Sequence, residues 1–218
     1  MLKKLTEEKQ AQILEAGIEA FAAHGLHGAS MAAIAREAQI SVGVLYKYYA
    51  NKEDFFQACL RHSLSSLEQV LRDVFAHEDK LLHYAAAIIR ALNTFGREHS
   101  SHIRMYHQIT TASGEQARQL AAEIEGVTAR LYTARIAQAQ NRGDLRQDMD
   151  PRFFAFFFDN LLMMLQFSCC CDYYRARLAL YCGDSPDSDP AAMEGELLKF
   201  LESAFTLEQK DILHRDNS

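Results

Sequence analysis

Residues 30 to 55 carry hydroxyl, phenol and ammonium groups at spacings that suit contact with DNA. Such groups bind phosphates, and small aliphatic side chains beside them can reach base edges. The candidate contact residues are Ser30, Ser41, Val42, Val44, Tyr46, Lys47, Tyr48 and Lys52. We expect phosphate contacts from Ser30, Tyr46, Tyr48 and Lys52, and base-edge contacts from Val42, Val44 and Lys47. The alternatives are core positions for Tyr46 and Tyr48 and a solvated surface position for Lys47.

Short helices must position these side chains. Ser30 and Ser41 are good N-cap residues, and apolar residues follow each of them at helical spacing. Only Gln39 and Ile40 separate the two expected helices. Helices this short need a third to cover them, and residues 6–24, before Gly25, have the required apolar stripe. The pattern predicts a helix-turn-helix unit, whose second element enters the major groove.

The same run resembles the N-terminal signature of TetR/AcrR-type transcriptional regulators. The resemblance covers roughly residues 8–56, about a quarter of the chain, and rests on Ile34-Ala35, Ala38, Ile40-Ser41, Gly43, Leu45-Tyr46, Tyr48-Tyr49 and Lys52-Glu53. It implies an all-α homodimeric regulator, usually a repressor, that a small-molecule effector releases from a palindromic operator in double-stranded DNA. It also implies an effector pocket in the remainder of the chain.

Two residues depart from the family pattern. Gln39 stands where the family usually has glycine, so a positive φ there would cost about 1 kcal/mol. Val44 stands where the family often has threonine, which removes a hydroxyl contact to phosphate and makes a methyl contact to thymine possible. Neither departure breaks the fold, but both alter the expected operator contacts.

The composition favours an all-α protein, and the length allows one domain or a small domain plus a medium one. The chain has 218 residues, only three prolines and a formal charge of −6. Residues 1–60 carry six Lys or Arg against seven Asp or Glu, so the N-terminal part is not a basic patch. Lys3 and Lys4 precede an amphipathic helix instead of the apolar core of a signal peptide, and the five cysteines do not suggest an exported disulfide scaffold. A cytoplasmic location is expected.

The pattern predicts about nine helices, in a DNA-binding domain over 1–50 and a ligand-binding and dimerisation domain over 51–218. Beyond the head, the expected helices are 51–76, 79–98, 101–112, 115–141, 151–182 and 190–207. The helix over 151–182, about 48 Å long, is apolar all round, so both faces must be covered. We expect a homodimer formed through 151–182 and 190–207. The alternative is a membrane span, which Asp159 would oppose at a cost of about 3 kcal/mol.

A ligand cavity in this second domain is a further expectation, with ordinary core as the alternative. Its candidate lining is Phe95, Met105, Tyr106, Tyr132, Phe156, Asp159, Met163 and Phe167. Asp159 is the most informative of these, because an ionised carboxylate in apolar surroundings needs a partner or a raised pKa. Arg104 could pair with it, it could lie exposed at a dimer edge, or it could attract a cationic ligand.

We expect no metal, cofactor or enzymatic activity. His83, His99, His102 and His107 raise the question of a metal, but Cys169, Cys170 and Cys171 point about 100° apart on a helix and cannot share one ion. Small buried thiols are the simpler interpretation. A helical enzyme or small-molecule-binding protein with a vestigial head is the alternative function, although the sequence has no nucleophile–base pair or phosphate loop that would support it.

Overall fold

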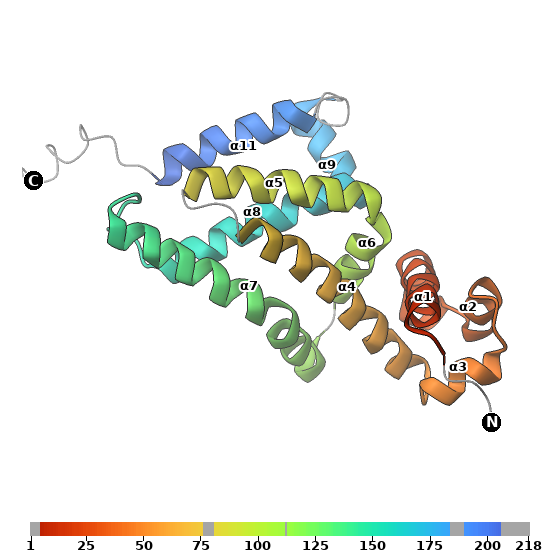
Figure 1. Ribbon diagram of the computed structural model, residues 1–218. Coiled ribbons are helices and arrows are strands. Elements are labelled where there is room, and N and C mark those ends of the chain that lie inside the picture. Colours follow the sequence, from red (N-terminus) through yellow and green to blue (C-terminus); the bar gives the residue numbers. More distant parts are fainter. Residues whose placement is uncertain (1–4, 76–80, 112, 184–189, 206–218) are drawn as a thin grey trace, which may run out of the picture.

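Ten α-helices form the computed structural model, which describes residues 5–75, 81–111, 113–183 and 190–205 (Figure 1). The helices are α1 (Glu7–Gly28), α2 (Met31–Glu37), α3 (Val42–Tyr48), α4 (Lys52–Phe75), α5 (Leu81–Glu98), α6 (Ser100–Ile109), α7 (Gly114–Arg142), α8 (Pro151–Cys170), α9 (Asp172–Cys182) and α11 (Pro190–Phe205). No strand occurs in these ranges, which confirms the predicted all-α class.

The helices α1–α3 form a small head, and the remaining helices form a larger body. Capping defines the head locally, because the Ser30 Oγ accepts from the Ala33 amide at 3.4 Å and the Ser41 Oγ accepts from the Val44 amide at 3.3 Å. The apolar core of the head continues into the first half of α4 through Phe55, Phe56 and Leu60. A domain boundary at residue 50 remains a prediction.

Gln39 has a positive φ of 54° in the turn between α2 and α3, which confirms the strained geometry anticipated for this position. The turn is held by the Ile40 amide, which donates to the Ala35 carbonyl at 2.8 Å. Gln39→Gly is therefore expected to raise the free energy of unfolding by about 1 kcal/mol, measured by urea denaturation. Gln39→Ala is the matched control, because it removes the side chain and keeps the Cβ; an equal gain from alanine would contradict the argument.

The body is built around α8. This helix packs between α7 on one side and α5 on the other, and α11 lies along α5 (Figure 1). One apolar cluster joins these helices and includes Ile88, Tyr132, Phe158, Leu162 and Leu201. The long helix α4 runs from the head into the body and therefore belongs to both (Figure 1).

The predicted single helix over 151–182 is wrong. The helix breaks at Cys171, which is extended at φ −112° and ψ 126°, so α8 and α9 are separate elements and the described helices number ten instead of nine. Cys170 and Cys171 are both buried with Phe95 and Phe167. Consecutive residues on a helix point about 100° apart, and the extended Cys171 lets both thiols face the same apolar cluster. Sequence periodicity missed this tertiary requirement.

Other helix ends differ by a few residues. The first helix does not stop at Gly25, whose φ of 66° makes a kink, but continues in a further turn to Gly28. The helix predicted over 101–112 ends at Ile109. The expected ends at 76, 79 and 207 lie outside the described residues.

The helix α8 has the length and hydropathy of a membrane span, the only such helix among the described residues. Within the protein, 44% of that stretch is buried against other helices. A core helix of a folded domain has the same composition, so this feature alone is weak support for a membrane role.

Candidate DNA-binding surface and body cavity

The helix α3 lies at the outer end of the head, away from the body (Figure 1). Leu45 is 1% exposed and anchors the helix in the head core, whereas Tyr46 is 48% exposed. Ser41, Val42 and Lys47 are exposed on the same short element. The core alternative for Tyr46 is therefore wrong, and α3 offers hydroxyl, methyl, phenol and ammonium groups to a partner outside the protein.

Two other candidate residues make contacts within the protein. The Tyr48 hydroxyl accepts from the Leu5 amide at 3.0 Å and is half-buried. The Lys52 ammonium donates to the carbonyls of His27 at 3.0 Å and Ala29 at 3.3 Å, and so ties the end of α1 to the start of α4. Each has a structural role, and phosphate contacts from them remain predictions. Val44 is partly exposed and Ser30, exposed, caps α2.

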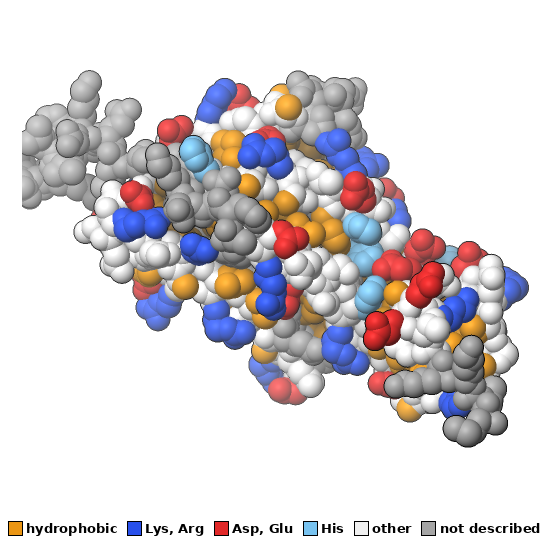
Figure 2. All heavy atoms as spheres, in the orientation of Figure 1, with side chains coloured by type: hydrophobic (Ala, Val, Ile, Leu, Met, Phe, Trp, Pro, Cys, Tyr) orange, Lys and Arg blue, Asp and Glu red, His pale blue; other side chains and the backbone are white. Residues whose placement is uncertain are grey.

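Acidic and basic side chains are mixed over the visible face of the head, and histidines gather where the head meets the body (Figure 2). The head therefore has no continuous basic surface on that face. Contact with DNA would depend on the placement of a few groups on α3, as the sequence indicated.

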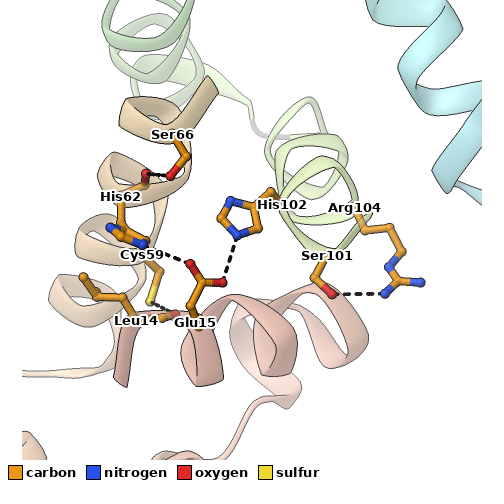
Figure 3. Close-up of polar contacts among 8 residues, drawn as sticks. All are labelled: Leu14, Glu15, Cys59, His62, Ser66, Ser101, His102 and Arg104. Carbon is orange, nitrogen blue, oxygen red and sulfur yellow. Dashed lines mark hydrogen bonds and ion pairs between the residues drawn. The ribbon is translucent and has the colours of Figure 1, made fainter. Parts of the chain in front are cut away.

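Glu15 on α1 joins the head to the body through two histidines (Figure 3). Its Oε1 lies 3.0 Å from Nε2 of His62 on α4, and its Oε2 lies 2.9 Å from Nε2 of His102 on α6. Burial raises the pKa of Glu15, but the hydrogen bonds and charges of His102 and His62 outweigh burial and hold this pKa below its ordinary value. Sequence reasoning singled out His102 only as a metal candidate and missed Glu15 and His62.

His102 is 3% exposed, and burial lowers its pKa more than Glu15 raises it. The neutral ring donates from Nε2 to Glu15, which leaves the buried Nδ1 without a partner among the described residues. A second proton would have to sit on this Nδ1 in apolar surroundings.

The stability of the protein is therefore expected to fall as the pH drops below about 6.5. The unfolded chain protonates His102 more readily than the folded chain does, so folding is favoured above the unfolded pKa and disfavoured below it. His102→Gln keeps a donor for Glu15, costs about 1–2 kcal/mol at pH 7 and flattens the fall between pH 6.5 and 5. The check is Tm against pH. His83→Gln, at an exposed histidine, should leave the profile unchanged.

The body contains two neighbouring hollows with shared lining residues, and together they include five of the eight candidate ligand residues. An inner cavity of about 50 Å³ includes Tyr106, Tyr132, Asp159 and Met163 in its lining. A groove of about 760 Å³ between α7 and α8 includes Phe156, and it shares Asp159 and Met163 with the inner cavity. Asp159 therefore stands where the groove meets the interior.

The other three candidates lie elsewhere. Met105 is buried in the head cluster, and Phe167 packs in the cluster around Cys170 and Cys171. Phe95 borders a separate hollow beside Glu15 and His102. For Met105 and Phe167 the alternative of ordinary core is confirmed.

Asp159 has no ion-pair partner among the described residues. Arg104 is exposed and donates to the Ser101 hydroxyl at 3.1 Å, so it does not fill this role. Burial, followed by the charge of Glu125, raises the pKa of Asp159 to about 7. Glu125 and Gln166, which the sequence analysis did not select, line the same inner cavity.

No group of three or more His, Cys, Asp or Glu side chains in the described ranges is arranged to hold a metal ion. Two of the thiols donate hydrogen bonds to backbone carbonyls of other helices. The Cys170 Sγ donates to the Gly96 carbonyl at 3.3 Å, and the Cys59 Sγ donates to the Leu14 carbonyl at 3.6 Å.

Taken together, the three-helix head with an outward α3 and the all-helical body define a helix-turn-helix protein with an appended helical domain. Residues 13–59 match the family model described as "Bacterial regulatory proteins, tetR family". The N-terminal head is therefore assigned to the type of domain that this family model describes.

Similar proteins agree with this assignment. The chain is 36% identical over 66 residues to the HTH-type transcriptional regulator HbdR of Aromatoleum sp. (strain CIB), a match that covers 30% of this chain and 29% of the relative. It is 33% identical over 102 residues to the HTH-type transcriptional repressor SCO4008 of Streptomyces coelicolor. This match covers 44% of this chain and 53% of the relative. The matched region thus spans at most about half the length of these relatives.

Solved structures extend the likeness to the body. The structure of AibR in complex with isovaleryl coenzyme A and operator DNA is similar with a TM-score of 0.59 and 25% identity, over 75% of this chain and 86% of that one. The structure of FadR of Bacillus subtilis in complex with stearoyl-CoA is similar with a TM-score of 0.72 and 17% identity. The likeness covers 90% of this chain and 100% of that one. The second likeness concerns the fold alone.

Proposed function

We propose that this protein is a ligand-responsive transcriptional regulator of the TetR type that acts as a repressor. One observation carries the proposal: α3 is exposed at the end of a head that matches the tetR model, and it presents Val42, Tyr46 and Lys47 outward. An exposed helix of this kind fits the major groove of DNA. In the proposed division, residues 1–50 bind operator DNA and residues 51–218 bind the effector and the second subunit.

Exposed aromatic side chains support the dimer. Phe153 and Phe157 on α8 and Phe200 on α11 are each more than half exposed. Large apolar side chains gathered on two helices favour burial against another surface, and a second copy would form a four-helix interface. A twofold dimer matches a palindromic operator.

The helix α6 supplies a structural route between effector and head. Its His102 contacts Glu15 on α1, and one turn later its Tyr106 hydroxyl donates to Glu125 in the body cavity at 2.5 Å. A ligand that displaces Tyr106 would therefore act on the helix that holds the head. A coupling of about 1–3 kcal/mol is enough to release the operator.

The likeness to AibR, solved with an acyl-CoA and operator DNA, supports both partners of the proposal. The proposal includes a cytoplasmic location and no enzymatic activity. The alternative of an enzyme or carrier with a vestigial head is less well supported, because the match to the tetR family model includes the whole of α3.

The test is selection of bound fragments from genomic DNA by the purified protein, followed by light scattering. We expect enrichment of a palindrome and a dimer at micromolar concentration. Failure to enrich any sequence, or a monomer in solution, would contradict the proposal.

A further inference from the structure

We propose that the body binds an organic amine, with its ammonium between Asp159, Glu125 and Gln166 and its apolar tail in the groove between α7 and α8. This inference rests on the proposed function and names the effector class. Three observations carry it: the charge of the inner cavity, an unsatisfied amide, and the sizes and shared lining of the two hollows.

The inner cavity has more negative charge than the protein balances. Asp159 on α8 and Glu125 on α7 both line it, and neither forms an ion pair among the described residues. Glu125 accepts one hydrogen bond from Tyr106. The third carboxylate of the lining, Glu68 on α4, is compensated by Arg72 at 3.2 Å. Both carboxylates are only partly exposed to water, and a ligand cation would supply a partner for the two at once.

The Gln166 side chain provides an independent sign of a missing partner. It is 7% exposed, lines the inner cavity, and its Oε1 has no hydrogen-bond partner in the part of the chain that the structure describes. Buried amide oxygens are nearly always satisfied, so an unpaired one in a cavity lining is an acceptor available to a ligand. The ionised carboxylates and this amide oxygen are acceptors, and an ammonium group is a donor with three hydrogens and no acceptor.

The two hollows match the two parts of such a molecule. The inner cavity, about 50 Å³, has room for a small polar group. The groove, about 760 Å³, is lined largely by apolar groups such as Ala134, Phe156 and Met163, and its size lies in the range of small-molecule sites. Arg130 and Arg152 border the groove; Arg152 pairs with Asp150, and neither forms an ion pair with Asp159 or Glu125.

The pKa of Asp159 makes the affinity for an ammonium ligand depend on pH. Its pKa of about 7 reflects burial and the neighbouring Glu125. The other titratable side chains around it are Tyr106 on α6, Tyr132 on α7 and Glu68 on α4. Because an ammonium ligand binds the ionised form, it must displace the proton from Asp159 at pH 6 and meets an ionised group at pH 8.

The experiment compares four eight-carbon probes on the full-length protein without DNA: octylammonium, octanol, octanoate and octanoyl-CoA. Affinity is measured by calorimetry and by the rise in Tm. We expect octylammonium to bind at least tenfold more tightly than the other three, and about tenfold more tightly at pH 8 than at pH 6. Equal or tighter binding of octanoate or octanoyl-CoA would overturn the inference.

Substitutions of single carboxylates test which of them bind the ammonium group. Asp159→Asn should weaken octylammonium at least tenfold, remove its pH dependence and leave octanol unchanged, and Glu125→Gln should also weaken it. Glu68→Gln is the matched control, since that carboxylate is already paired, and should not change the affinity. An unaltered octylammonium affinity in Asp159→Asn would also overturn the inference. The wild-type probe series decides the question if a variant does not fold.

Failure of this inference and failure of the proposed function are distinguishable. Selection of genomic DNA does not depend on the amine, and probe binding is measured without DNA. A protein that enriches an operator but prefers octanoyl-CoA remains a regulator with a different effector class.

Discussion

Tyr46→Ala is expected to weaken operator binding by the dimer about 30- to 1000-fold while leaving Tm unchanged. The side chain is 48% exposed on α3 and packs little in the head core, so its loss removes a contact to DNA instead of a contact within the fold. A hydrogen bond to a charged phosphate contributes roughly 1–2 kcal/mol. Because the dimer presents the residue twice, the loss is about 2–4 kcal/mol, which gives that range of affinity.

The measurement is fluorescence anisotropy with the selected operator at fixed salt, since phosphate contacts depend on ionic strength. Gln119→Ala is the control, because Gln119 is exposed on α7, outside both the head and the expected dimer segments. Its operator affinity should equal that of the wild type. A Tyr46→Ala dimer that binds normally would remove α3 as the recognition helix. A variant with a lowered Tm would instead give Tyr46 a structural role.

The head was predictable because its determinants are local. Ser30 and Ser41 lie directly before the helices they cap, and the side-chain bonds to Ala33 and Val44 are three residues apart in sequence. The strain at Gln39 could also be anticipated, because the family that the sequence resembles usually has glycine at this position. Signals that act within one turn can be read without knowing the tertiary structure.

The body site was predictable only in part. The sequence drew attention to Asp159 because a carboxylate inside an apolar helix is unusual, but its neighbours come from other helices. Glu125 and Gln166 have no distinguishing pattern in their own segments. The bridge from Glu15 to His102 spans 87 positions, and the break at Cys171 depends on what the two thiols pack against. Tertiary packing, which periodicity does not encode, creates all of these features.

Gly17→Ala is expected to lower the free energy of unfolding by about 1–3 kcal/mol, although alanine is the better helix former. Gly17 lies on α1 where it crosses α4, and a Cβ at this position would lie 2.5 Å from both the Cys59 Sγ and the Phe55 Cζ. Both neighbours are buried and cannot withdraw into solvent. The helices α1 and α4 must therefore move apart where they cross. This contact attaches the head to the helix that runs into the body.

Gly126→Ala supplies the matched control, because a Cβ there would meet only the flexible Arg130 Nη1, at an ordinary contact distance of 3.5 Å, on α7 outside the expected dimer segments. That substitution should stabilise the protein by about 0.5–1 kcal/mol through helix propensity alone. Urea denaturation of the two variants should therefore give opposite signs. Adding Cys59→Ala to Gly17→Ala should recover part of the loss if steric contact is its cause. If both substitutions changed the free energy of unfolding in the same direction, α1 and α4 would not approach as closely at Gly17 as the structure shows.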